Sequence, residues 1–206
     1  MNGASRPTLT ARVGEEYTAL AATYDRDWAA YNRATAARTR AALEARTRPA
    51  GPVLNVGCGT DPAASTGVAN TVGLDPSAAM LAVARGRHPG PLVRGDAAAL
   101  PFAGGTFAAA VTNSALHYIG DPAAAVRELH RVLAPGAPCV WTDWNGGSLT
   151  TQAVCFWLSK IGRPLGTVLT SSEMANAMTN AGFRDVRTDR WRHGLLWGLA
   201  TVSGVK

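Results

Sequence analysis

The sequence VLNVGCGTDP, at residues 53–62, is the strongest indication of architecture in this chain. Val53 to Val56 are apolar enough to form a buried strand, and Gly57 ends the run. Because Gly57 and Gly59 lack a Cβ, the backbone can turn sharply there and approach a ligand closely. A glycine-rich turn also occurs without any ligand, so this stretch by itself predicts a strand and a turn only.

Strands and helices alternate in the rest of the chain. The expected strands are residues 53–56, 71–74, 107–112, 139–142, 183–187 and 195–202. Asp121-Pro122 predicts the start of one helix between them, and Ser171 or Ser172 predicts the cap of another that Gly182 closes. This alternation predicts an α/β fold with a single doubly wound, mostly parallel sheet and helices on both faces.

Residues 8–48 form a stretch rich in Ala and Arg that is predicted to be helical. It ends at Pro49-Ala50-Gly51-Pro52, because proline cannot continue a helix. Steps of three and four residues give it one face that can lie on the protein body, formed by Trp28, Tyr31, Thr35, Arg38 and Ala42. We therefore expect residues 1–48 to form an N-terminal helical lid segment and residues 49–206 to form the core of one structural domain.

Composition limits the class of protein. The 206 residues are 47% hydrophobic and 17% charged, which favours a packed globular core. No apolar run approaches the roughly 20 residues of a membrane span, and no signal peptide is evident at the N-terminus. The three cysteines form no CxxC pair, so we expect no metal site and a reducing compartment. These features predict a soluble, cytoplasmic protein without membrane insertion.

The net charge of +6 raises the possibility of nucleic-acid binding. The excess of arginine lies near the two ends of the chain, and only two residues are lysine. No stretch is both densely basic and interleaved with aromatic residues, as a strand-binding groove would require. A solvated surface or an anionic small substrate therefore explains the charge better than nucleic acid does. The sequence gives no indication of oligomeric state.

Asp75 directly follows the second expected strand, eighteen residues after Gly57. At the carboxyl end of a parallel strand, a carboxylate at this spacing can accept hydrogen bonds from both hydroxyls of a ribose. A dinucleotide is disfavoured, because Pro62 occupies the place of the third glycine and Asp61 would face the phosphates. The pattern therefore predicts an adenosine-containing ligand without phosphates.

Four stretches in order resemble the motifs of a known family: VLNVGCGTDP, GLDPSAAMLAVAR, GDAAALPFAGGTFAAAVTNSALHYI and DPAAAVRELHRVLAPGA. They are similar to the Rossmann-like (class I) S-adenosylmethionine-dependent methyltransferases, in the small-molecule subgroup, over about residues 53–144. The resemblance implies a seven-stranded sheet with its last strand antiparallel. It also implies that S-adenosyl-L-methionine lies across the strand ends. The spacing after Gly57 is shorter than is common in the family, so the first connecting helix is expected to be short.

By position in these motifs, the methionine part of the cofactor would meet the glycine turn, the ribose would meet Asp75 and the adenine edge would meet Asp96 and Ala97. Asn113 and Ser114 would lie beneath the methionine part. The implied cofactor-binding residues are Gly57, Cys58, Gly59, Asp75, Pro76, Met80, Asp96, Ala97, Asn113 and Ser114. Asn55 stands where the family usually has an acidic residue.

His117 is the candidate catalytic residue, because it is the only histidine next to the implied site. Methyl transfer from a sulfonium depends mainly on alignment, and a general base helps when the acceptor is a hydroxyl. The alternative is a structural histidine bonded to the backbone. His88, His130 and His193 are expected on the surface.

Aromatic residues gather after the fifth expected strand, which predicts an apolar or aromatic acceptor. Ordinary core filling is the competing explanation. The candidate substrate-binding residues are Tyr24, Tyr31, Tyr118, Asp143, Trp144 and Trp157. Trp141 and Phe156 belong to the same aromatic group. We expect methyl transfer to a small, apolar or aromatic molecule. The alternatives are cofactor binding without methyl transfer, as a scaffold or in other catalysis, and, third, a nucleic-acid methyltransferase.

Overall fold

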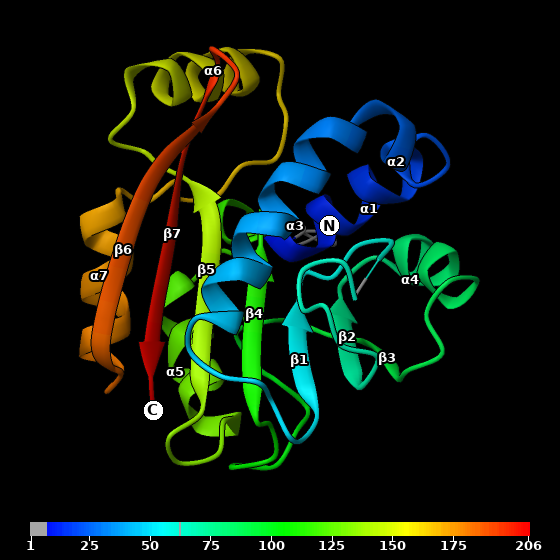
Figure 1. Ribbon diagram of the computed structural model, residues 1–206. Helices are drawn as coiled ribbons and strands as arrows, with labels where there is room; N and C mark the ends of the chain where they lie inside the picture. The colour runs from blue at the N-terminus through cyan, green and yellow to red at the C-terminus, as the bar shows by residue number, and fades with distance from the viewer. Residues whose placement is uncertain (1–7, 62) are drawn as a thin grey trace, which may run out of the picture.

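Seven strands form one sheet in the computed structural model, which describes residues 8–61 and 63–206 (Figure 1). The strands are β1 Val53–Val56, β2 Thr71–Asp75, β3 Leu92–Arg94, β4 Ala109–Asn113, β5 Pro138–Trp144, β6 Arg184–His193 and β7 Trp197–Val205. Their order across the sheet is β3-β2-β1-β4-β5-β7-β6. Every pair from β3 to β5 is parallel, whereas β7 is antiparallel to both β5 and β6. The predicted α/β fold with a mostly parallel seven-stranded sheet is confirmed.

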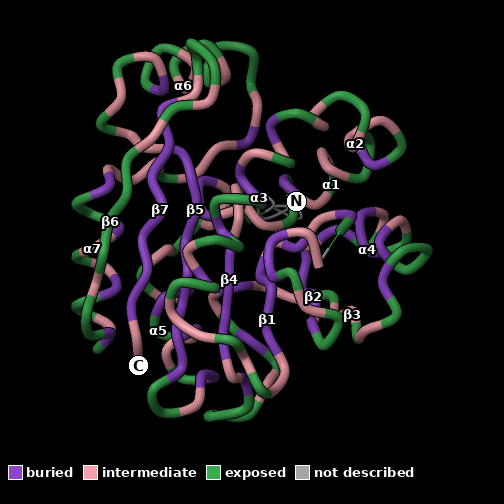
Figure 2. The backbone as a smooth tube through the Cα atoms, viewed as in Figure 1, coloured by how far each residue is buried: buried purple, intermediate pink, exposed green. Residues whose placement is uncertain are grey.

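Burial follows the position of each strand in the sheet (Figure 2). All residues of β1 and β5 are buried, as expected for central strands covered by helices on both faces. The edge strand β6 is mostly exposed. The structure adds β3, a three-residue strand too short to leave a pattern in the sequence. The predicted strand at 107–112 begins only at Ala109, since Phe107 forms an isolated bridge with Leu133.

Helices cover both faces of the sheet. They are α1 Leu9–Leu20, α2 Tyr24–Asp27, α3 Ala29–Glu44, α4 Ala78–Arg85, the 3-10 helix η1 Leu116–Tyr118, α5 Pro122–Val132, α6 Leu149–Lys160 and α7 Ser171–Asn180. As predicted, Asp121 caps α5, where its side chain accepts a hydrogen bond from Ala124 N at 2.9 Å. The N-cap of α7 lies one residue before the predicted Ser171. Thr170 caps it in a capping box with Glu173.

The N-terminal segment is helical, as predicted, and its described part forms the three helices α1, α2 and α3. The long helix α3 packs on β4 and β5, and Tyr31 and Thr35 of its predicted inner face are buried. Arg38, also expected on that face, is exposed and pairs with Asp189. The first helix α1 contacts α4 and η1 instead of the sheet. It therefore lies across the strand ends, at the site described below (Figure 1).

Two further expectations about connections need correction. Between β1 and β2 the described residues form turns and no helix, so the short helix expected in this connection is absent from them. Pro62 lies outside the described residues. His88 is buried instead of exposed, because the chain returns along the start of β2 and places Nε2 of its ring 2.7 Å from the carbonyl oxygen of Thr71. Within residues 8–61 and 63–206, no helix has the length and hydropathy needed to cross a bilayer.

Candidate functional site

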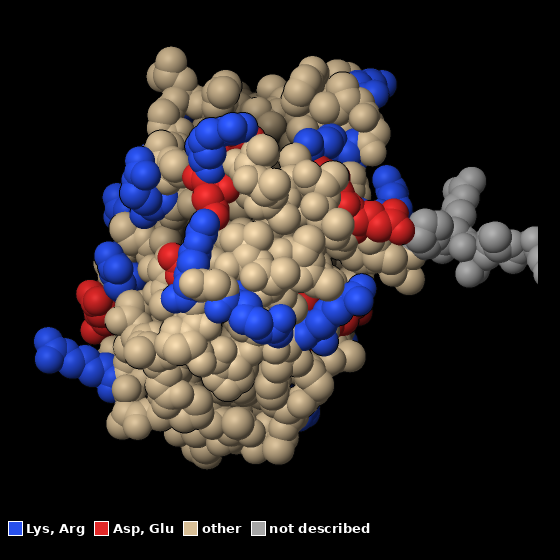
Figure 3. All heavy atoms as spheres, turned by 90° about the vertical axis from the view of Figure 1, so that its right-hand side faces the viewer, with Lys and Arg blue, Asp and Glu red and all other residues tan. Residues whose placement is uncertain are grey.

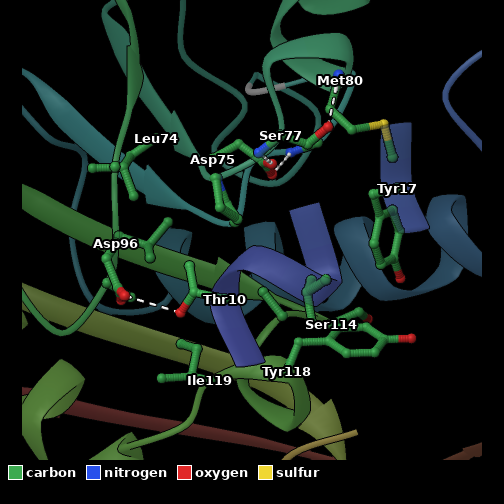
Figure 4. Close-up of a pocket in the computed structure, with 18 of the residues that line it drawn as sticks. Thr10, Tyr17, Leu74, Asp75, Ser77, Met80, Asp96, Ser114, Tyr118 and Ile119 are labelled. Atoms are coloured by element: carbon green, nitrogen blue, oxygen red, sulfur yellow. Dashed lines mark hydrogen bonds between the residues drawn. The ribbon is translucent and has the colours of Figure 1, made fainter. Parts of the chain in front are cut away.

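A pocket lies at the carboxyl ends of β1, β2 and β4, beneath α1 (Figure 4). We call it the rim pocket. It encloses about 720 Å³, including its open mouth. All but one of the ten predicted cofactor-binding residues line it: Gly57, Gly59, Asp75, Pro76, Met80, Asp96, Ala97, Asn113 and Ser114. Cys58 points to the other side of the glycine turn.

The glycine turn depends on two positive φ angles. Gly57 has φ 68°, and a Cβ there would come within 2.2 Å of the Ala115 Cβ, so only glycine fits against the segment after β4. Gly59 has φ 57° and open space where a Cβ would lie. Its N–H donates a hydrogen bond to Asp75 Oδ2 at 2.9 Å. The turn after β1 is thereby joined to the carboxylate at the end of β2.

Asp75 is held by two backbone donors. Its Oδ1 accepts from Ser77 N at 2.9 Å and its Oδ2 accepts from Gly59 N (Figure 4). Burial raises the pKa of this carboxyl to about 6, although both hydrogen bonds act in the opposite direction. Each carboxylate oxygen can accept a second hydrogen bond. Asp75 is thus fixed in orientation and still able to accept from a ligand in the rim pocket.

The second carboxylate of the rim pocket connects the sheet to α1. Asp96 Oδ1 accepts from Ala98 N, and its Oδ2 accepts from the Thr10 hydroxyl at 2.9 Å (Figure 4). Thr10 belongs to no sequence motif. It reaches Asp96 only because α1 packs across the strand ends. Among the described residues that line the rim pocket there are two carboxylates and no lysine or arginine. The rim pocket therefore suits a neutral or cationic nucleoside and opposes a pyrophosphate.

A polar groove lies on the other side of the glycine turn and is lined by Asn55 and Cys58. We call it the arginine groove, after Arg33, Arg40 and Arg87 in its wall. Burial raises the pKa of the Cys58 thiol well above its ordinary value, so this cysteine is a packed thiol instead of a nucleophile. The arginine groove shares four residues with the rim pocket: Tyr24, Gly57, Gly59 and Asn113. One extended ligand can therefore occupy both.

A third pocket, the aromatic pocket, opens between the N-terminal helices, η1 and α6. Five of the six predicted substrate-binding residues line it: Tyr24, Tyr31, Tyr118, Trp144 and Trp157. It also contains Trp28 and Trp197, which the sequence analysis did not select. Four residues belong to both this pocket and the rim pocket: Tyr17, Tyr24, Ser114 and Tyr118. Tyr24 lines all three cavities.

His117 lies in the wall of the aromatic pocket and pairs with a buried carboxylate. Its Nδ1 is 2.5 Å from Asp143 Oδ1, and its ring stacks on Trp144 at 3.9 Å between centroids. Asp143 also accepts from Leu116 N and Trp144 N, both at 2.6 Å. The ring of His117 is therefore bonded to a side chain and not to the backbone. Asp143, predicted to bind substrate, lies behind His117 and does not line the pocket.

Hydrogen bonds connect the wall of the aromatic pocket to Ser114, which this pocket shares with the rim pocket. Trp144 Nε1 donates to the Tyr31 hydroxyl at 2.9 Å, and the Tyr31 and Ser114 hydroxyls share a hydrogen bond of 2.9 Å. Ser114 has φ 55°, an unusual value for a residue other than glycine, and its N–H donates to Thr142 O. Such local strain is typical of sites where the surrounding structure holds a residue for function.

Two residues of the expected aromatic group lie elsewhere. Trp141 is fully buried in the main core, so core filling explains it. Phe156 is 65% exposed and lines none of the three cavities. Trp28 and Trp197 take their place. Trp197 is missed by sequence reasoning because it comes from β7, more than fifty residues after the other aromatics of strand β5.

The fold and the rim pocket define a Rossmann-like nucleoside-binding protein. Residues 54–141 match the family model described as a methyltransferase domain. A demethylmenaquinone methyltransferase of Streptomyces griseus is 34% identical over 151 residues, covering 70% of this chain and 66% of that protein. A 2-phytyl-1,4-naphtoquinone methyltransferase of Synechocystis is 32% identical over 132 residues, covering 57% of this chain and 56% of that protein. This chain thus spans less than two thirds of the length of either relative.

A solved structure from Thermotoga maritima, described as an S-adenosylmethionine-dependent methyltransferase and possible histamine N-methyltransferase, has the same fold. It superposes with a TM-score of 0.74 at 18% identity, covering 93% of this chain and 99% of that one. Residues 54–141 therefore carry the domain of the class I S-adenosylmethionine-dependent methyltransferases, the family that the motifs resemble. The cofactor of this family is S-adenosylmethionine. The rim pocket fits its nucleoside and its positive sulfonium, because the described lining residues include two carboxylates and no lysine or arginine.

Proposed function

We propose that this protein transfers a methyl group from S-adenosylmethionine to a small apolar acceptor with an aromatic ring. One observation carries the proposal: the rim pocket and the aromatic pocket share a wall formed by Tyr17, Tyr24, Ser114 and Tyr118. A methyl donor in the first pocket and an acceptor in the second therefore lie next to each other, as an in-line displacement requires.

In this proposal the cofactor extends along three sites. Asp75 accepts hydrogen bonds from the ribose, Asp96 and Ala97 meet the adenine, and the amino-acid end passes the glycine turn into the arginine groove. There its carboxylate is near Arg33 and Arg40, which line that groove. When bound, the cofactor supplies a methyl group on a positively charged sulfur. Tyr24 lines all three cavities, so its ring is well placed to stabilise that charge.

The acceptor class follows from the wall of the aromatic pocket and from the relatives. Tryptophan and tyrosine rings dominate that wall, which suits a flat apolar molecule. The two curated relatives are named as methyltransferases of demethylmenaquinone and of a phytyl naphthoquinone. We therefore propose a quinone-like or phenolic ring as acceptor.

His117 is the proposed general base. Its Nδ1 is engaged with Asp143, which fixes the ring and leaves Nε2 to take a proton from a hydroxyl of the acceptor. When bound, S-adenosylmethionine would supply the methyl group to this oxygen, and its sulfur would keep the electron pair of the broken carbon–sulfur bond. Asp143 is a positioning residue that selects the tautomer and stabilises the protonated ring.

The two other hypotheses have less support. Binding of the cofactor without methyl transfer would not require a His–Asp pair in the wall of a second pocket. Nucleic-acid binding is disfavoured because only two residues are lysine, and because Arg38, Arg46 and Arg87 are paired with carboxylates. We place the protein in the cytoplasm, where its three free cysteines would stay reduced.

Methyl transfer to a panel of hydroxylated naphthoquinones and phenols tests the proposal, with S-adenosylhomocysteine as the measured product. In single turnovers His117→Ala should slow transfer by roughly 10² to 10⁴, the usual contribution of a general base. Asp143→Asn should slow it and alter its pH profile, because the ring loses its fixed tautomer. Cofactor affinity should stay unchanged in both variants.

The matched control is His130→Ala, which removes a histidine that packs on Phe183 outside the three cavities. Its rate should equal that of the native protein. Full activity of His117→Ala would remove the base assignment. No product with any acceptor, despite tight cofactor binding, would favour the hypothesis of cofactor binding without methyl transfer.

A further inference from the structure

All the large apolar side chains that are more than half exposed, within the described part of the chain, lie at one end of the molecule. We call them the apical patch: Leu149, Phe156, Trp157, Ile161, Leu195 and Leu196. Four come from α6 and its C-cap, and two come from the turn between β6 and β7. Leu149 is 81% exposed and Leu195 is 85% exposed, so neither contributes to a core.

The two parts of the apical patch are held together. Figure 1 shows α6 beside the tip of the β6–β7 hairpin, beyond the end of the sheet. The Thr151 hydroxyl of α6 donates to Gly198 O of β7 at 3.0 Å, and the Thr151 side chain is buried. The patch is therefore one surface on a fixed support. A continuous exposed apolar surface of this kind marks an interaction site.

The apical patch borders the aromatic pocket. Trp157, Ile161 and Leu196 belong to both: each is more than half exposed and each lines the pocket. An acceptor that enters the aromatic pocket on this side must cross the patch. Whatever covers the patch therefore also controls what reaches the pocket.

The two chain segments that form the apical patch carry charge of one sign. Residues 145–172 and 190–206 contain no Asp or Glu. Lys160 has its Nζ 5.1 Å from the centre of the Phe156 ring, and Arg192 donates to the Leu195 carbonyl at 2.5 Å. Arg190 borders the same cavity as Leu149. Apolar side chains bordered by cations, with no acidic residue among them, are typical of a surface that meets anionic lipid headgroups.

We propose that the apical patch docks on an anionic lipid bilayer and brings the mouth of the aromatic pocket to the membrane surface. An acceptor with a long hydrocarbon tail then passes from the bilayer into the pocket without crossing water. This second step rests on the proposed function. Docking is peripheral, with the leucine, phenylalanine and tryptophan side chains at the level of the headgroups. The reactive ring enters the pocket while the tail remains among the lipids.

Sedimentation with vesicles tests the docking. The full chain is mixed with vesicles of phosphatidylcholine alone, or with about 30% phosphatidylglycerol, at about 150 mM salt. We expect binding to the anionic vesicles. The variant Leu149→Ser/Phe156→Ser/Leu195→Ser should bind at least tenfold more weakly. None of these three residues lines the aromatic pocket, so methyl transfer to a tail-less acceptor in solution should be unchanged.

Two double variants, each of which removes two positive charges, test the role of charge in the docking. Lys160→Gln/Arg190→Gln should weaken binding to anionic vesicles more than tenfold, since each cation near the surface contributes roughly fivefold. Arg85→Gln/Arg127→Gln removes two exposed arginines from α4 and α5 and should change binding less than twofold. Equal losses in both pairs would mean non-specific attraction and would overturn the proposal.

Two further results would overturn the docking. One is the absence of native protein from the vesicle pellet. The other is a native dimer that becomes a monomer in the serine variant, because the patch would then be an interface between two copies. Failure of the proposed function gives a different result: vesicle binding persists, but no acceptor is methylated in solution. Docking without any rate advantage for a long-tailed acceptor on vesicles would refute only the transfer from the bilayer.

Discussion

At the scale of single residues, Asp75 shows how the backbone prepares a ligand site. Two backbone N–H groups, from Gly59 and Ser77, fix the carboxylate, while burial raises its pKa to about 6. A buried carboxylate is costly to ionise without a partner. Hydroxyl donors from a ribose would relieve this cost, so the free site favours a ligand that brings two such donors.

This pKa predicts that cofactor binding depends on pH. Ribose hydroxyls favour the ionised carboxylate, so affinity should rise as pH increases through about 6 and then level off. Calorimetry with S-adenosylhomocysteine should give a Kd about tenfold higher at pH near 5 than near 7.5, since only about a tenth of the carboxyl is ionised at the lower pH. Asp75→Asn should bind more than tenfold more weakly than the native protein at the higher pH, without this dependence. Equal native affinities at both pH values would contradict the ribose contact.

The pair of His117 and Asp143 shows a second effect at this scale. Twenty-six residues separate them, yet η1 and the end of β5 bring Nδ1 and Oδ1 within 2.5 Å. The sequence indicated each as a site residue but assigned Asp143 to the substrate. The Asp143 carboxylate accepts three hydrogen bonds, one from the His117 ring and two from backbone N–H groups. Its role is therefore to position the histidine.

At the scale of elements, α1 forms the cover of the rim pocket. It is fastened on one side by Thr10 to Asp96, and on the other by the ion pair of Glu16 with Arg163. Tyr17 of the same helix packs edge to face on Tyr118 at 5.3 Å between centroids. Since α3 is packed on the sheet, we propose that residues 1–48 act as a lid in which α1 is the part that opens for the cofactor. Its contacts with the core are side-chain contacts that can break and form again.

The lid proposal predicts the effect of removing one fastening. Thr10→Val keeps the shape of the side chain but loses the hydrogen bond to Asp96, so dissociation of S-adenosylhomocysteine should become about threefold to tenfold faster. Stopped-flow fluorescence of the nearby tryptophans measures this rate. Thr10→Ser retains the hydroxyl and is the control. An unchanged rate in Thr10→Val would show that α1 does not limit release.

The N-terminus of α5 provides a prediction about stability alone. Asp121 accepts from Ala124 N, and the first helical position is Pro122, whose missing N–H needs no partner. Asp121→Ala should lower the free energy of unfolding by about 1 kcal/mol, the usual value of an N-cap, and Tm by about 2–4 °C. Asp121→Asn preserves the cap and should melt close to the native protein. A loss of stability in Asp121→Asn equal to that in Asp121→Ala would exclude the cap as the cause.

At the scale of the whole molecule, the excess positive charge is divided among separate places. Figure 3 shows basic side chains scattered over one face, several of them beside acidic ones. Three arginines are paired across the fold: Arg38 with Asp189, Arg46 with Asp185, and Arg87 with Asp25. Each of these pairs is locally neutral, so the net charge of +6 comes from basic residues elsewhere in the chain. No extended basic strip is formed by the described residues on this face.

This distribution predicts weak binding to nucleic acid. At about 150 mM salt the protein should elute from immobilised DNA and RNA with the void fraction, because few phosphates can be neutralised together. The same column at low salt measures the slope of retention against salt. Tight retention at the higher salt would revive the hypothesis of a nucleic-acid methyltransferase.

Much of the fold and part of the site were determined by the sequence itself. Apolar runs, glycine turns and Asp-Pro caps act over a few residues, so they specified most of the strand and helix order and placed Gly57 and Asp75 at strand ends. The same local rules located most residues of the rim pocket, since parallel strands bring their carboxyl ends to one edge. They failed at short or edge elements such as β3, whose half-exposed residues leave no periodic signal.

Only the tertiary structure decided which distant side chains meet. Thr10 reaches Asp96 across eighty-six residues, Trp197 completes a pocket begun by Trp28, and Asp143 turns behind His117 instead of toward the acceptor. The exposed side chains of the apical patch likewise come together only when the hairpin lies beside α6. Such contacts depend on how whole elements pack, and packing involves residues far apart in the chain. Local patterns carry no information about them.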